Sequence, residues 1–175
     1  MARNRIAAVL LLAAALPPAW SQAPDAARIS EVAGRGADVM PFDLKATIHI
    51  FTETSDGGVQ RVVARNRGDV AQARLVRQHM QELRGQFLRG DFSGPEHIHG
   101  AGMPGLAALK AAAPDSIAIA YREIPDGAEL VYRTQAPALV GALHQWFTAQ
   151  VSDHGPDAVV GHHDGHHHHD MPAGK

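Results

Sequence analysis

The C-terminal end of the chain concentrates side chains that bind metal ions. Six histidines and two aspartates fall within nine consecutive residues. Neutral imidazole is the commonest nitrogen ligand for zinc, copper and nickel, so such a segment has several ways to place three or four ligands on one ion. We expect low-selectivity metal binding by this tail; its imidazoles also gain charge below pH ~6.5, which suits a pH-responsive solubility tail. The residues are His162, His163, His166, His167, His168 and His169, with Asp164 and Asp170.

A purification tag is the other interpretation of this run. The histidines are interrupted by Asp164 and Gly165, however, and six further residues follow His169. The sequence therefore favours a native metal-binding tail.

A second candidate metal site lies in the loop predicted at 91–104. One residue separates His97 from His99, and Met103 follows four residues later. Alternate residues of an extended chain share a side, so both imidazoles are expected to point the same way. Nitrogen and thioether ligands together suit copper, Cu(I) especially. We predict an ordered copper or zinc site here, completed by a helical histidine, with His144 as the first candidate. The other candidate ligands are His79 and His154.

Each candidate ligand also has an ordinary structural interpretation. His79 and His144 occupy apolar sides of predicted helices, where a histidine is commonly a packed and hydrogen-bonded core residue. Short His-x-His pairs also arise by chance in a chain with 12 histidines. The ordered site therefore depends on how the fold brings these side chains together.

Signatures of other chemistry are absent from the sequence. With no cysteine, a disulfide, a zinc thiolate site, an iron–sulfur cluster and a cysteine nucleophile are all excluded. The glycines at 100–105 match a dinucleotide pattern but follow no predicted strand, and no nucleophile elbow, zincin motif or phosphate loop occurs. The alternative function is a small enzyme in which a buried His79 or His144 acts as general acid or base near a bound anion. Metal binding is favoured because no nucleophile or orienting acid accompanies such a base.

The N-terminus has the pattern of a secretory signal. Arg3 and Arg5 precede an apolar stretch at 6–16, and small residues, Ala19 and Ser21, then mark a cleavage site after Ser21. The apolar stretch is shorter than the ~20 residues that span a membrane, and no cysteine follows for lipid attachment. We expect a periplasmic or secreted protein without a membrane anchor.

Length and composition indicate the size of the folded domain and exclude some classes of partner. A chain of 175 residues with 45% hydrophobic residues and a mean hydropathy of −0.16 is typical of one globular domain. The formal net charge of −2 and the pI near 6.6 argue against nucleic acid, because phosphate neutralisation needs a basic surface. The expected partners are transition-metal ions.

The order strand, turn, strand, helix occurs twice along the chain. Alternation predicts a strand at 46–51, and a turn at 56–58 follows because glycine supplies the positive φ that a tight connection needs. A strand at 59–64 and a helix of about 20 residues capped by Asp69 come next. The second copy has strands around 117–121 and 130–132, a turn at 125–127 and a helix from Pro137 to about 151, after a short helix at 105–113.

This order predicts an α+β fold. We expect an antiparallel sheet from two β-hairpins, each followed by a helix (ββα-α-ββα), with the helices on one face. His49 alternates with Ile48 and Ile50 and is expected at the surface. The expected divisions are a signal peptide at 1–21, a flexible N-terminal arm at 22–41, the α+β domain at 42–154 and a disordered His-rich tail at 155–175.

Several segments between residues 41 and 155 resemble a known group of proteins. They read PFDLKAT at 41–47, GGVQ at 57–60, MPGL at 103–106, PDGA at 125–128, PALV at 137–140, ALHQWF at 142–147 and DHG at 153–155, with His99-Gly100 between them. They are similar to short exported proteobacterial proteins sometimes named aspartate carbamoyltransferase. The resemblance implies export and the extent of the domain, and the name implies carbamoyl transfer to aspartate. The Ser-Thr-Arg-Thr and His-Pro-x-Gln segments of carbamoyltransferases do not occur in this sequence.

Overall fold

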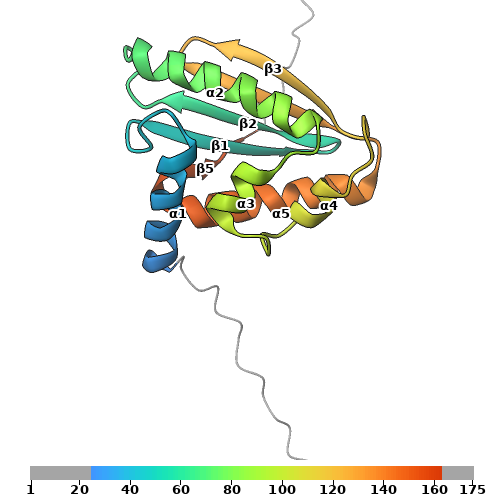
Figure 1. Cartoon of the computed structure of the whole chain (residues 1–175). Helices are drawn as coiled ribbons and strands as arrows, with labels where there is room; N and C mark the ends of the chain where they lie inside the picture. Colours follow the sequence, from blue (N-terminus) through green and yellow to red (C-terminus); the bar gives the residue numbers. More distant parts are fainter. Residues whose placement is uncertain (1–24, 163–175) are drawn as a thin grey trace, which may run out of the picture.

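The computed structural model describes residues 25–162, and it shows a five-stranded sheet packed against helices (Figure 1). Helices and strands are both present in one unit, so the predicted α+β class is confirmed. The elements in chain order are α1 (Ala26–Val39), β1 (Thr47–Thr54), β2 (Gly57–Ala64), α2 (Val70–Leu88), α3 (Ser93–His99), α4 (Leu106–Lys110), β3 (Ala118–Ile124), β4 (Gly127–Arg133), α5 (Pro137–His154), the 3-10 turn Gly155–Asp157 and β5 (Ala158–Val160).

The sheet has the order β3-β4-β2-β1-β5. Two antiparallel hairpins, β1 with β2 and β3 with β4, meet through an antiparallel pairing of β2 with β4. The short strand β5 pairs with β1 in parallel, so the sheet is mixed and the expectation of a purely antiparallel sheet was wrong. The register places His49, Val62 and Ala128 in one row across the central strands.

Both long helices cover the same face of the sheet. Tyr132 on β4 contacts Phe87 of α2 and Trp146 of α5, with ring centroids 6.5 and 6.0 Å away. The other face carries Glu129, which is held by Arg61 and Arg122 from the neighbouring strands. Side chains along a strand point alternately to the two faces of the sheet. The helices bury one face and leave the other in water, so the strand residues on the helical side form the core.

Local sequence signals explain where the long helices begin. The Asp69 carboxylate accepts a hydrogen bond from the Gln72 amide at 3.1 Å, so the predicted N-cap of α2 is confirmed. Pro137 lies in the first turn of α5, where its missing N–H costs nothing. Within residues 25–162, no helix is long and apolar enough to cross a membrane.

The flexible arm expected at 22–41 is largely a helix. Helix α1 begins after the N-cap Asp25, packs against α3 and α5, and buries Val32 completely. Alanine and glycine separate its apolar residues, so the sequence shows no sustained apolar stripe. The partner surface provided by α3 and α5 makes this helix part of the core.

Residues 155–162 also belong to the folded unit, although they were expected in the tail. Strand β5 extends the sheet, and the Asp157 carboxylate before it pairs with Lys45 and Arg65. A three-residue strand is too short to be recognised by alternation in the sequence. The rest of the predicted tail and the predicted signal peptide lie outside the described residues.

Candidate functional site

Four histidines and two methionines line one interior cavity of about 40 Å³. The cavity lies between the sheet and the helices, where β1, α2, α3 and α5 come together. Imidazole nitrogen and thioether sulfur are both good ligands for soft transition metals, so the composition of this wall differs from that of an ordinary apolar core. The six side chains are His49, His79, His99, His154, Met40 and Met80.

His49 lies on the helix-facing side of β1 and is 5% exposed, so its predicted surface position was wrong. Its ring stacks on His154, with centroids 5.0 Å apart and planes within 7°. The Nδ1 atom has no hydrogen-bond partner among the described residues. A neutral imidazole carries one proton and one lone pair, so Nδ1 can supply the lone pair to a metal when the proton is on Nε2.

His154 is the last residue of α5 and closes one end of the histidine cluster. Its Nε2–H donates to the side-chain oxygen of Gln150 at 3.2 Å, one turn earlier on the same helix. The ring of His99 meets it edge to face, with centroids 5.0 Å apart. His154 thus bridges the strand histidine and the α3 histidine.

His99 is held in one orientation by a charged pair behind it. Its Nδ1–H donates to the Asp153 carboxylate at 2.9 Å, and Arg28 of α1 contacts the same carboxylate at 2.6 Å. Arg28 also donates to the backbone carbonyl of His99. The proton on Nδ1 leaves the lone pair of His99 on Nε2, which is the arrangement seen where a carboxylate orients a metal-binding histidine.

The remaining ligand-type side chains come mainly from α2. His79 lies one residue before Met80, and its ring meets Phe42 edge to face at 5.5 Å. Met80 is fully buried, and Met40, just after α1, is 8% exposed. His79, predicted as one of the helical ligands, is therefore on the cavity wall.

Burial keeps these imidazoles neutral. Desolvation lowers the pKa of His49 to about 4 and that of His154 to about 2, and the positive fields of neighbouring histidines add to the effect. Burial also lowers the pKa of His79 and that of His99, although Asp153 opposes the shift at His99. Neutral imidazole is the form that binds metals, so the cluster needs no deprotonation at neutral pH.

The predicted loop site is not assembled as expected. His97 and His99 lie on helix α3, where residues two apart point to opposite sides, so the extended conformation was wrong. The His97 side chain is 53% exposed and lies 3.4 Å from Asp38. Met103 is buried but lines a separate surface cleft with His99.

His144, the expected helical partner, has a hydrogen-bonding role instead. Its Nε2–H donates to the backbone carbonyls of Thr54 and Gly57, each at 3.0 Å, at the ends of β1 and β2. It lines the cleft that contains Met103 but not the histidine cavity. His99, His79 and His154 are thus brought together, whereas His97, Met103 and His144 are not part of the cluster. Of the tail histidines only His162 lies within the described residues, on the open sheet face.

The geometry of the cluster stops short of a finished metal site. Among residues 25–162, no three histidine, aspartate or glutamate side chains are placed to hold one ion together. Two imidazoles on one ion have ring centroids about 5 Å apart, given bonds of ~2.0–2.1 Å to nitrogen. The centroid separations of His154 from His49 and His99, 5.0 Å each, meet that requirement, but the stacked planes do not. Rotation of the rings is needed before their lone pairs converge.

Sequence reasoning missed His49, Met40 and Met80 on the cavity wall, and Asp153 behind His99. His49 was missed because Ile48 and Ile50 appeared to mark the buried face of β1, whereas Phe51 on the face of His49 is the more buried side chain. Asp153 was missed because its target lies 54 residues away in the sequence. An alternation test that weighted the aromatic residue above the isoleucines would have found His49.

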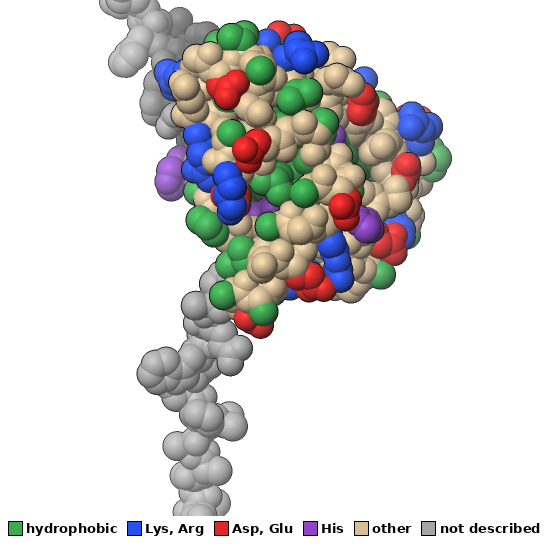
Figure 2. All heavy atoms as spheres, turned by 60° about the vertical axis from the view of Figure 1, so that its left-hand side comes forward, with side chains coloured by type: hydrophobic (Ala, Val, Ile, Leu, Met, Phe, Trp, Pro, Cys, Tyr) green, Lys and Arg blue, Asp and Glu red, His purple; other side chains and the backbone are tan. Residues whose placement is uncertain are grey.

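One face of the molecule has a hollow surrounded by charged side chains. On the face shown in Figure 2, basic and acidic side chains are interspersed around a hollow lined by hydrophobic side chains, and histidine is visible at only a few points.

Comparison with protein-family models, with curated sequences and with solved structures finds no match for this chain. The inference about function therefore depends on the residues themselves.

Proposed function

We propose that this protein is an exported transition-metal-binding protein whose interior cavity takes up one Cu(I) ion. The observation that carries the proposal is the presence of four imidazoles and two thioethers on the wall of one small cavity between the sheet and the helices. Imidazole with thioether is a donor set suited to Cu(I) more than to zinc or a hard cation. Zinc is the second choice of metal.

The hydrogen bonds behind the rings support this assignment. They leave a lone pair on Nε2 of His99 and on Nδ1 of His154, and Nδ1 of His49 has no hydrogen-bond partner among the described residues. Asp153 and Arg28 hold His99 from behind, which fixes its tautomer and raises its basicity toward a metal. Rotation of His49 out of its stack completes a convergent set in this proposal.

The two ends of the chain fit the same role. The secretory signal pattern at 1–21 supports export from the cytoplasm. Intact-mass analysis of exported protein tests this, since processing would leave a chain that begins at residue 22. The histidines at 162–169 act as a low-selectivity collector that raises the local metal concentration near the cavity.

The test separates the cavity from the tail within the full chain. Replacing all six tail histidines by asparagine removes the collector, and Cu(I) binding is then measured by competition with a chromophoric Cu(I) chelator. We expect one tightly bound Cu(I) per chain. Replacing His99 by glutamine should reduce the affinity at least about tenfold, because it removes one ligand.

Two further variants control for folding and for general histidine loss. His97→Gln changes an exposed histidine two residues before His99 on α3 and should leave Cu(I) binding intact. Met80→Leu keeps the buried volume but removes the sulfur, so affinity should fall while thermal stability changes little. Equal Cu(I) affinity in the His99→Gln and His97→Gln proteins, or no binding once the tail is substituted, would rule out the cavity site.

A second candidate function is general acid–base catalysis at His99. The Asp153 carboxylate orients this imidazole, and both residues line a surface cleft of about 620 Å³; the His99 side chain is only 1% exposed, so this role requires a movement that opens Nε2 to the cleft. In this alternative, His99 takes the role of general base that the sequence suggested for His79 or His144. The copper measurement separates the candidates, because a general base at His99 does not require a Cu(I) site in the cavity.

A further inference from the structure

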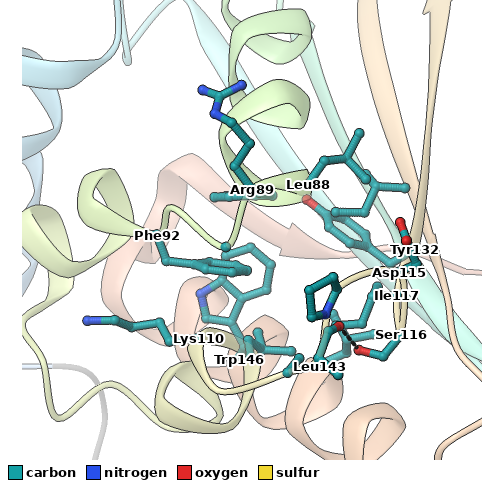
Figure 3. Close-up of a pocket in the computed structure, with 17 residues that line it drawn as sticks. Leu88, Arg89, Phe92, Lys110, Asp115, Ser116, Ile117, Tyr132, Leu143 and Trp146 are labelled. Carbon is teal, nitrogen blue, oxygen red and sulfur yellow. Dashed lines mark hydrogen bonds between the residues drawn. The ribbon is translucent and has the colours of Figure 1, made fainter.

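A second cavity, of about 280 Å³, shares Phe87 and Trp146 with the histidine cavity. Figure 3 shows this second cavity. The end of α2, the segment between α4 and β3, and α5 form its walls. Aromatic rings dominate the floor: Phe92 and Phe87 meet the Trp146 indole edge to face at 6.2 and 5.7 Å. Its size is near the lower end of small-molecule sites, and well above a cavity of ~150 Å³ that accepts benzene.

The floor contains a hydrogen-bond donor with nothing to bond. Trp146 is fully buried, and its Nε1–H has no partner among the described residues. Figure 3 shows the nitrogen on the edge of the indole that faces Phe92 and Lys110. Lys110 lines this cavity and not the histidine cavity, so the donor lies on this side, but neighbouring side chains cover it and must move aside before a ligand can reach it. Buried indole N–H groups usually have an acceptor, and a bound ligand can supply one.

Charge at the rim favours an anionic acceptor. Arg89 and Lys110 lie at the mouth with a single acid, Asp115, and Lys110 is shared with Glu96. The rim also exposes 42% of Leu88, an apolar surface next to the opening. Asp115 adopts a positive φ of 62°, which non-glycine residues rarely do, and this shapes the segment that forms the outer wall.

We propose that this cavity binds a small aromatic carboxylate. The ring lies in the cavity against the wall that Phe87, Phe92 and Trp146 form, and the carboxylate accepts the indole N–H once the side chains that cover it move aside. The ligand class follows from three features together: a cavity with aromatic walls, one unpartnered donor, and at the rim the Arg89 guanidinium, which has no ion-pair partner among the described residues. This binding activity is separate from the metal site and does not depend on it.

The tryptophan itself reports on occupancy. The chain contains two tryptophans, at positions 20 and 146, so a full chain carrying Trp20→Phe has Trp146 as its only emitter. Titration with phenylacetate, in EDTA to keep the histidine cavity metal-free, should change Trp146 emission to saturation. Acetate, which lacks the ring, and 2-phenylethylamine, which lacks the acceptor and carries positive charge, should each bind at least about tenfold more weakly.

A matched pair of substitutions locates the site. Ala112→Phe fills the cavity, whereas Ala107→Phe adds the same side chain on the exposed face of α4 outside it. Phenylacetate binding should be lost only in the first. Trp146→Phe keeps a ring but removes the N–H, so the affinity measured by ligand-observed NMR should fall about tenfold.

The proposal is overturned by any of three results. The first is the absence of a saturable change with phenylacetate. The second is binding of acetate or 2-phenylethylamine as tight as that of phenylacetate, and the third is equal binding of phenylacetate by the Ala112→Phe and Ala107→Phe proteins. If Ala112→Phe fails to fold, the comparison of the three ligands and the Trp146→Phe measurement still decide the question.

Discussion

His49 and His154 are uncharged residues of the core at neutral pH because their stacked rings are removed from water. Each has a pKa in the folded protein, about 4 and about 2, that lies below the value of ~6.5 for an unfolded histidine. Protons therefore bind the unfolded chain first as the pH falls. The stabilising contribution is complete above pH ~6.5 and is lost as the pH falls toward the folded pKa values.

The metal-free protein should consequently lose stability on mild acidification. Between about pH 7 and about pH 5, we expect a loss of roughly 2 kcal/mol for each of the two imidazoles in the free energy of unfolding. Urea unfolding in EDTA at pH 7 and at pH 5 measures this loss of stability. His49→Gln should make the dependence on pH shallower, whereas His97→Gln, which changes an exposed ring, should not. Parallel slopes in all three proteins would contradict this account of the cluster.

Helix α1 links the N-terminal part of the chain to the histidine cavity. Val32 anchors the helix in the core, and Arg28, one turn earlier, reaches Asp153 and the His99 carbonyl. The orientation of His99 is therefore a property of helix packing as well as of its direct hydrogen bond. Loosening α1 should weaken the charged pair behind His99.

The anchoring role of α1 is tested by a matched valine pair. Val32→Ala removes two methyl groups from a fully buried position and should cost about 2 kcal/mol in the free energy of unfolding. Val70→Ala, at the exposed start of α2 with 73% exposure, should change it by no more than ~0.5 kcal/mol. Chemical denaturation of both proteins measures the difference. Equal stabilities would mean that α1 does not contribute to the core.

The whole molecule combines one packed sheet-and-helix unit with two terminal segments outside the described residues. The C-terminal boundary of the folded unit falls after β5, because Ala158 of β5 is buried and pairs with His49 of β1. Asp157, just before that strand, binds Lys45 and Arg65. The folded unit thus extends beyond the end of α5 to β5. Strand β5 forms the edge of the sheet next to His49 and the histidine cavity.

Two truncations test this boundary. A chain that ends at His162 should keep the melting temperature of the full chain, because every described element is retained. A chain that ends at Gly155 loses β5 and the Asp157 ion pairs, and it uncovers the edge of β1, so its melting temperature should fall by several degrees. Differential scanning calorimetry compares them. A chain ending at Gly155 that melts with the full chain would place the boundary before β5.

Signals between near neighbours were sufficient for much of the fold. The carboxylate of Asp69 begins α2, Pro137 begins α5, and the Asp-Gly turns at 56–57 and 126–127 close the two hairpins. Each of these devices acts over two to four residues, so it can be recognised without knowing the rest of the structure. The α+β class followed from their order.

Long-range packing decided the rest, including the candidate site. The sequence by itself determined the supply of imidazole and thioether ligands, the absence of cysteine chemistry and most helix and strand positions. Only the tertiary structure decided that α1 and β5 join the core, that β1 turns His49 inward, and that His99 meets Asp153. The physical reason is that these contacts join residues far apart in the sequence, and their energy depends on surfaces that exist only after the sheet and helices have packed.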